Sequence, residues 1–361
     1  MSGHPSAAPP LLFPEEPRRI LLLLPSLLSE AIQATPLIGA IFARFPQAEI
    51  TLLLDHAQHS LLQGTPWVGR CRFRVPQERG LRSRRHSRHL QAQLRSDGFD
   101  LAVLLPDSLS SAWLCWRIGA RRRVGFDRHS RGWLLTDPLP PPGGADYLSM
   151  SRLERYAVIA RALGCPPPDV QLSLQATPAA DAAAAARLQA AGIGPRGPLV
   201  LLYPAADAGS VGAWPAERFA AVADHLVRRR GANVVIVPEP GEVAAGQAIH
   251  SAMGHAAVLL DAPCLEPAEV NALVARANLV LGNDSAGRQI AAAFGVPRVT
   301  VFGPTDPRRS DNGHAGETIV RVTVPCGPCH RRKCPLEEQV CMTRVSVDAV
   351  SGACEQALAG A

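Results

Sequence analysis

The feature that most constrains the fold is a series of short apolar runs that alternate with amphipathic stretches. Unalternating apolar runs bounded by Gly, Pro or Asp are typical of strands buried on both faces of a parallel sheet. They lie at 20–24, 50–54, 100–106, 198–204, 233–238, 278–282 and 298–303. Helical patterns lie between them, for example at 31–45, 215–231 and 266–277. The alternation predicts an α/β chain built on doubly wound sheets.

The chain length favours two domains, because 361 residues exceed what a single hydrophobic core usually organises. We expect a disordered Pro- and Ala-rich tail over 1–17, a Rossmann-like domain over 18–178 and a second one over 179–361. The connection between the domains is expected within 164–198. Two such domains would face each other across a cleft lined by the carboxyl ends of their strands, where ligands bind.

The apolar runs are too short to anchor the chain in a membrane. None approaches the ~20 residues that a membrane-spanning helix needs. The run 20–24 follows Arg18 and Arg19 but stops at Pro25, which favours a buried strand over a signal peptide. We therefore expect a cytoplasmic protein.

The charge pattern indicates an anionic partner for the first domain. The formal net charge is +6, and Lys333 is the only lysine, so phosphate binding would have to rely on other groups. Residues 1–150 hold 18 arginines against 12 acidic residues, with dense runs at 82–89 and 121–123. Such runs attract phosphorylated sugars, acidic lipids or nucleic acid. A solvated helix face is the alternative for 82–89. With 5% aromatic residues and no binding module, we expect no nucleic acid partner.

The strongest local signal is a pair of polar loops after neighbouring strands in the second half. The strand at 278–282 runs directly into a helix, whose amino end favours anionic or hydroxylated ligands. A plain helix cap is the alternative. The strand at 298–303 ends in a second polar loop. The loops contribute Asp284, Ser285, Ala286, Gly287, Gly303, Thr305 and Asp306.

The segment 282-GNDSAGRQIAAAFGVPRVTVFGPTDP-307 resembles the signature of glycosyltransferase family 9, the ADP-heptose:lipopolysaccharide heptosyltransferases. Three further segments resemble the family in the same order, at 20–36, 204–219 and in the Cys-rich tail 325–342. The resemblance implies a GT-B fold, with the acceptor on the N-terminal domain and the ADP-sugar on the C-terminal one. It also implies heptose transfer with inversion to the inner core of lipopolysaccharide, without a cofactor, at the inner face of the cytoplasmic membrane. We expect a monomer.

The sequence departs from the family pattern at several positions that the resemblance marks as functional. Glu30 stands where the family has the aspartate presumed to be the general base, and Ser29 replaces the preceding glycine. Gly212 replaces a lysine that meets the donor phosphates, Gln289 replaces a histidine and Arg288 a methionine. Glutamate keeps the carboxylate but places it about one methylene further out.

Arg288 has two alternative interpretations. It could bind the donor diphosphate in place of the lost lysine, or it could be a solvated surface arginine. The resemblance adds Ser210, Trp214 and Glu242 to the donor-binding set, with Glu242 directed to the ribose hydroxyls.

The acceptor would meet the first domain. Arg121, Arg122 and Arg123 follow a predicted helix, and we expect them to face the cleft and bind the anionic lipopolysaccharide core.

The replaced residues leave two other functions open. One is a non-catalytic or regulatory GT-B protein that binds a nucleotide sugar. The other is a different GT-B enzyme, such as a sugar-nucleotide epimerase, although the Cys-rich tail and the loop at 303–307 weigh against it.

Four cysteines in the tail have a spacing compatible with a tetrahedral zinc site, with His330 nearby. They are Cys326, Cys329, Cys334 and Cys341. Free thiols in a packed loop, or a disulfide or cluster, are the alternatives to structural zinc.

Overall fold

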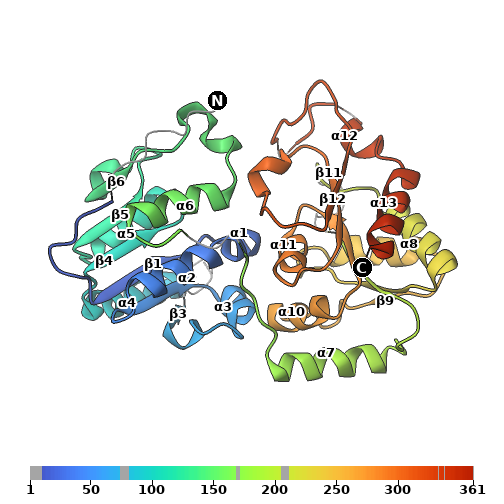
Figure 1. The fold of residues 1–361 in the computed structure, drawn as a ribbon, viewed down its shortest axis with the longest axis horizontal. Coiled ribbons are helices and arrows are strands. Elements are labelled where there is room, and N and C mark those ends of the chain that lie inside the picture. Colours follow the sequence, from blue (N-terminus) through green and yellow to red (C-terminus); the bar gives the residue numbers. More distant parts are fainter. Residues whose placement is uncertain are drawn as a thin grey trace. The chain divides into compact units, whose positions relative to one another are not determined.

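The structure, a computed structural model, describes residues 10–73, 81–167, 171–204, 211–331, 333–336 and 338–360. It consists of two compact units, Met1–Ser173 and Leu174–Ala361. Each unit is built on a six-stranded sheet in which neighbouring strands pair in parallel (Figure 1). The predicted α/β architecture of two doubly wound domains is therefore confirmed.

The sheet of the first unit has the strand order β3-β2-β1-β4-β5-β6. Its strands are β1 (Arg19–Leu23), β2 (Glu49–Leu54), β3 (Cys71–Phe73), β4 (Leu101–Leu104), β5 (Arg122–Phe126) and β6 (Asp137–Leu139). In β1 every residue after Arg19 is buried, as expected for a central strand covered on both faces. Successive strands are added outward from β1 on one side and from β4 on the other, so the topological switch point lies between these two parallel strands. Ligands of such sheets bind at the carboxyl ends of the strands there.

The helices of the first unit fill the connections between these strands. They are α1 (Leu28–Gln33), α2 (Thr35–Arg44), α3 (His56–Leu62), α4 (Leu81–Asp97), α5 (Leu109–Arg117) and α6 (Arg152–Ala162), with 3₁₀ turns η1 (Val68–Arg70), η2 (Gly132–Leu134) and η3 (Gly144–Ser149). The single helix predicted over 31–45 is wrong, because α1 and α2 are separate helices joined at Ala34. Pro36 has no amide hydrogen to donate and lies in the first turn of α2, where it requires a new start.

One face of this sheet packs against α4, α5 and η2. Their buried side chains form one apolar cluster with β1, β2 and β4, and it includes Leu94 of α4, Cys115 of α5 and Leu134 of η2. The three elements therefore share one outer surface of the unit.

The second sheet repeats the same topology, with the order β12-β11-β10-β7-β8-β9. Its strands are β7 (Leu199–Tyr203), β8 (Asn233–Ile236), β9 (Val258–Leu259), β10 (Leu279–Asn283), β11 (Arg298–Phe302) and β12 (Glu317–Arg321). The topological switch point lies between β7 and β10, so the predicted loops after β10 and β11 start at the carboxyl edge of neighbouring strands.

The first helix of the second unit, Pro178–Ala190, lies within 164–198, the segment expected to connect the domains. The helices of this unit are α7 (Pro178–Ala190), α8 (Ala216–Arg230), α9 (Val243–Ala252), α10 (Pro267–Ala275), α11 (Ala286–Ala293), α12 (Val340–Thr343) and α13 (Val347–Ala359), with the 3₁₀ turn η4 (Pro307–Ser310). The helix predicted over 215–231 is confirmed as α8, and Gly231 follows its last residue with a φ of 60°. No helix in the described part of the chain is long and apolar enough to cross a membrane.

The amino-terminal tail was expected to be disordered over 1–17, and residues 1–9 lie outside the described residues. The rest of this prediction is wrong. The amide of Leu11 donates to the carbonyl of Ala162 at 2.7 Å, and Glu16 pairs with Arg44 at 2.7 Å. Backbone and charge contacts therefore attach the segment from Leu11 onward to the first unit.

Candidate active site

The loops after β10 and β11 meet at the carboxyl edge of the second sheet. Asp284 follows β10, Thr305 follows β11, and their side chains are hydrogen-bonded. Ser285 caps α11 by accepting from the amide of Arg288. Burial raises the pKa of Asp284, and the nearby charge of Arg288 only partly offsets that effect. The structure thus brings together the two strand ends that the sequence predicted.

The small residues of these loops serve close packing. A Cβ atom on Gly287 would lie 2.5 Å from the ring of Tyr203, the last residue of β7. A Cβ atom on Gly303 would lie 2.1 Å from the sulfur of Met342 in α12. The Cys-rich tail therefore packs closely against the backbone at Gly303, one of the predicted site residues.

Asp306 is occupied within its own loop. Its carboxylate accepts from the backbone amide of Arg308 at 3.0 Å and from the guanidinium of the same residue at 2.6 Å. These contacts hold the pKa of Asp306 below its usual range. Asp306 therefore shapes the loop that carries Thr305.

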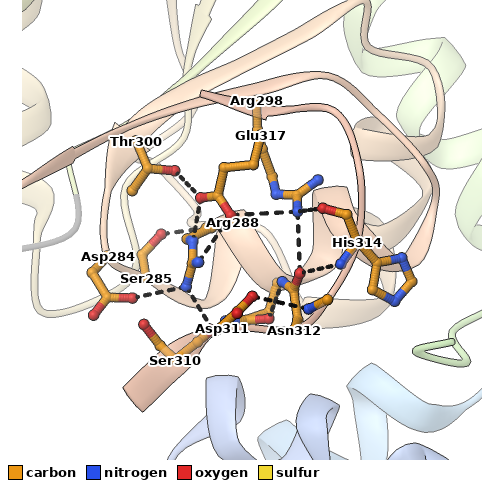
Figure 2. A network of polar contacts seen from close by, with 12 residues as sticks. Asp284, Ser285, Arg288, Arg298, Thr300, Ser310, Asp311, Asn312, His314 and Glu317 are labelled. Atoms are coloured by element: carbon orange, nitrogen blue, oxygen red, sulfur yellow. Dashed lines mark hydrogen bonds and ion pairs between the residues drawn. The ribbon is translucent and has the colours of Figure 1, made fainter. Parts of the chain in front are cut away.

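Arg288 is the centre of a buried polar network (Figure 2). Its guanidinium is 2% exposed and donates to both carboxylate oxygens of Glu317, at 2.5 and 2.9 Å. It also lies 3.3 Å from Asp284 and donates to the carbonyl of Ser310 at 2.8 Å. The interpretation of Arg288 as a solvated surface arginine is wrong, because β12 and the loop before it cover the side chain.

Glu317 joins this network to a second buried arginine (Figure 2). Arg298 lies 3.4 Å from Glu317 and donates to the side chain of Asn312 at 3.1 Å. Thr300 donates to Glu317 at 2.7 Å. Burial alone would raise the pKa of Glu317, but the hydrogen bonds and charges of Arg288 and Arg298 outweigh it and lower that pKa. Glu317 is thus an ionised acid paired with two cations.

Gln289 belongs to the same loop framework. It is fully buried, donates to the carbonyl of Ser310 at 2.9 Å and accepts from Asn312 at 2.7 Å. The residue that replaces the family histidine therefore fixes the segment between β11 and β12.

The three other residues predicted for the donor site differ in their surroundings. Trp214 is 3% exposed, and its indole nitrogen donates to the carbonyl of Val345 at 3.2 Å, so it packs in the core. The carboxylate of Glu242 accepts from the backbone amide of Glu239 at 3.3 Å. Ser210 lies outside the described residues.

In the first unit, Glu30 lies on α1, just after the carboxyl end of β1. Its side chain is 19% exposed and forms an ion pair with Arg152 at the start of α6. Burial raises the pKa of Glu30, and the charges of Arg152 and Arg155 offset only part of this rise. A carboxylate with a raised pKa is a stronger base than an exposed one, which suits it to accept a proton.

A second acid, Asp107, lies near Glu30 and was not predicted as a site residue. Asp107 follows β4, accepts from the hydroxyl of Tyr147 at 2.7 Å and lies 3.5 Å from the buried Arg131. Its position after the apolar run 100–106 was the available signal. The guanidinium groups of Arg128 and Arg155 lie over the ring of Tyr147, 4.2 and 4.6 Å from its centroid.

The run Arg121–Arg123 lies away from this edge. Arg122 pairs with Leu101 at the amino ends of β5 and β4, the end of the sheet opposite to Glu30 and Asp107. Arg122 forms an ion pair with Asp137, and Arg123 donates to the carbonyl of Leu134 at 2.6 Å. This placement contradicts the expectation that the run faces the ligand-binding edge. A helix of nine residues precedes β5, and it returns the chain to the amino edge of the sheet.

The predicted zinc site gains no support. Within the described residues, which include all four tail cysteines, no group of three or more His, Cys, Asp or Glu side chains could hold a metal ion. All four are free thiols: Cys341 is buried on α12, Cys326 is exposed, and Cys329 and Cys334 are partly exposed. Burial and the neighbouring thiols raise the pKa of Cys341.

Comparison with known proteins matches most of the chain to one family. The sequence profile of glycosyltransferase family 9 (heptosyltransferase) matches residues 87–340. The chain is 28% identical over 237 residues to lipooligosaccharide heptosyltransferase 2 of Haemophilus influenzae. That match covers 62% of this chain and 66% of the relative, just under two thirds of its length.

Two solved structures share the fold over nearly their whole length. A glycosyl transferase family 9 protein from Veillonella parvula has a TM-score of 0.80 at 19% identity, covering 95% of this chain and 98% of that one. The ADP-heptose lipopolysaccharide heptosyltransferase II of E. coli has a TM-score of 0.77 at 21% identity, covering 95% and 99%.

Proposed function

The chain belongs to glycosyltransferase family 9, and from that premise we propose that it transfers a heptose from ADP-heptose to the inner core of lipopolysaccharide with inversion. The observation that carries the proposal is Glu30, a largely buried carboxylate with a raised pKa at the carboxyl edge of the first sheet. Membership of this family argues against the sugar-nucleotide epimerase.

In the proposed reaction, Glu30 is the general base. Its carboxylate takes the proton of an acceptor hydroxyl, the acceptor oxygen bonds to the anomeric carbon of the heptose, and ADP leaves from the opposite face. Arg152 fixes the position of the carboxylate through their ion pair. Burial keeps the carboxylate basic despite this cation.

The donor is proposed to bind at the second sheet, with its diphosphate at the amino end of α11. Asp284, Ser285 and Thr305 offer polar contacts there, and the backbone of Ala286 and Gly287 lies where a helix favours negative charge. Arg288 is proposed to act as a positioning residue. Its guanidinium bonds Glu317 and Ser310, so it holds Asp284 and the adjoining loop in place.

The acceptor is proposed to meet arginines at the carboxyl edge of the first sheet. Arg128, Arg152 and Arg155 gather around Tyr147 and Glu30. Their positive charge complements an acidic saccharide, and Arg128 follows the end of β5, at the edge where ligands bind. No cofactor takes part in the proposed reaction, which would occur at the inner face of the cytoplasmic membrane.

A second candidate function is nucleotide-sugar binding without transfer. One observation favours it: the guanidinium of Arg288, offered by the sequence as a substitute for the lost lysine, is bonded to Glu317, Asp284 and Ser310 instead. The departing diphosphate would then depend on the helix amino end for stabilisation.

The test is turnover of ADP-heptose with a heptose-deficient core acceptor. We expect ADP release with the wild-type protein. Glu30→Gln should abolish it while ADP affinity changes by no more than a few-fold, since the variant removes the proton acceptor and little bulk. A wild-type protein that binds ADP-heptose without turnover, whatever stands at position 30, would establish the non-catalytic function.

A further inference from the structure

The outer side of α5 carries an apolar stripe that the fold leaves exposed. Leu109, Trp113 and Trp116 follow one another at helical spacing and are 48%, 44% and 47% exposed. The two indole rings lie 5.0 Å apart. Ala112 and Cys115, on the other side of α5, are fully buried in the core of the unit. One side of α5 therefore packs in the core, and the apolar stripe on its other side is not needed for that packing.

A third indole lies on the neighbouring element. Trp133 belongs to η2, which contacts α5, and it is 70% exposed. Three of the five tryptophans of the chain are thus exposed on two contacting elements, although indoles are usually well buried. Leu109, Trp113, Trp116 and Trp133 are called the indole patch below. Large exposed apolar groups that cluster in this way mark an interaction surface.

Exposed arginines lie on α5 and on the helix that contacts it. Helix α4 contacts α5 and covers the same face of the sheet, and its sequence holds five arginines and a single acidic residue, Asp97. Arg88 and Arg95 of this helix are exposed, and so is Arg117 at the end of α5. The surface therefore combines indoles with a positive charge.

We propose that the indole patch and the arginines around it dock the first unit on an anionic phospholipid bilayer. Tryptophan prefers the headgroup region, where the ring is partly buried and its N–H stays hydrated. Arginines near the surface are attracted to acidic headgroups, which supplies the charge complementarity. The proposal rests on the proposed function in one respect: docking would bring the protein to an acceptor that is anchored in the membrane. Docking itself requires no turnover.

The experiment is flotation of the full chain with vesicles of phosphatidylcholine, with and without phosphatidylglycerol. We expect binding to the acidic vesicles, a blue shift of tryptophan emission, and weakening by salt. The variant Trp113→Ser/Trp116→Ser/Trp133→Ser should bind roughly tenfold or more weakly, because it removes the interfacial anchors.

Charge variants separate the arginines from a general effect of net charge. Arg88→Glu/Arg95→Glu should weaken binding to acidic vesicles by about tenfold or more. The matched control is Arg228→Glu/Arg229→Glu, which reverses two exposed arginines of α8 in the other unit, and it should bind like the wild type. Circular dichroism checks that each variant is folded.

Three results would overturn the proposal. The first is that the wild-type protein does not bind acidic vesicles, and the second is that the triple serine variant binds them as well as the wild type does. The third is that the wild-type protein is a dimer and the triple serine variant is a monomer. The last result would assign the patch to a second copy of the chain. Transfer to a soluble, lipid-free acceptor should be unchanged in the serine variant. Vesicle binding without any sugar transfer would instead contradict the proposed function and leave the docking surface in place.

Discussion

Replacing Arg288 by methionine should destabilise the second unit by about 3 kcal/mol. Breaking a buried ion pair from one side typically costs 3–5 kcal/mol, because it leaves an uncompensated charge. Glu317 is 8% exposed in its side chain and would lose two hydrogen bonds, at 2.5 and 2.9 Å. It would keep Thr300 at 2.7 Å and Arg298 at 3.4 Å, which places the cost near the lower end of the range.

A variant of Glu317 tests whether the loss of stability comes from the ion pair between Arg288 and Glu317. Glu317→Gln removes the charge that Arg288 faces, so the double variant should be destabilised less than the sum of the two single variants. We expect a coupling of about 1–3 kcal/mol, as for residues in one network. If Arg288 positions Asp284 rather than touching the donor, both single variants should also weaken ADP binding.

The assay is urea unfolding followed by circular dichroism, together with calorimetric titration of ADP. The matched control is Arg276→Met, which breaks a 2.8 Å ion pair with Asp181 in the same unit, where the two side chains are 38% and 47% exposed. Exposed pairs contribute at most about 1 kcal/mol, so this variant should unfold almost like the wild type. The reasoning is refuted if Arg288→Met unfolds like Arg276→Met.

Three further predictions concern Glu30, Gly212 at the position of the family lysine, and Arg121 of the basic run 121–123. Burial raises the pKa of Glu30 and a base must be ionised, so kcat/KM should fall as pH drops through a value above that of an exposed glutamate. A limb at the ordinary glutamate value would contradict this. Gly212→Lys should fold, because no atom lies within 4 Å of an added Cβ. It should tighten ADP binding by about tenfold, and an unchanged Kd would mean the family lysine site is lost. Arg121 is 80% exposed and 3.5 Å from Asp100, so Arg121→Glu should leave the acceptor KM unchanged; a raised KM would restore the cleft-facing hypothesis.

The sequence by itself determined strands β1, β2 and β4 of the first sheet, β7, β8, β10 and β11 of the second, and the edges where chemistry can occur. Unbroken apolar runs such as 20–24 are typical of strands covered on both faces, and the helices between them favour parallel pairing. The position of Asp284 beside Thr305 followed from this, because neighbouring parallel strands end at the same edge. The placement of Glu30 after β1 followed for the same reason.

Only the tertiary structure decided which partner each charged side chain has. Arg288 at a helix start fitted a ligand contact or a solvated position equally well, and the deciding residue, Glu317, comes 29 residues later in the chain. Asp107 likewise pairs with Tyr147, 40 residues away. A local pattern sets which face of an element is buried. The energy of a charge in a low-dielectric interior depends on groups that other elements bring within hydrogen-bonding distance, and no local pattern contains them.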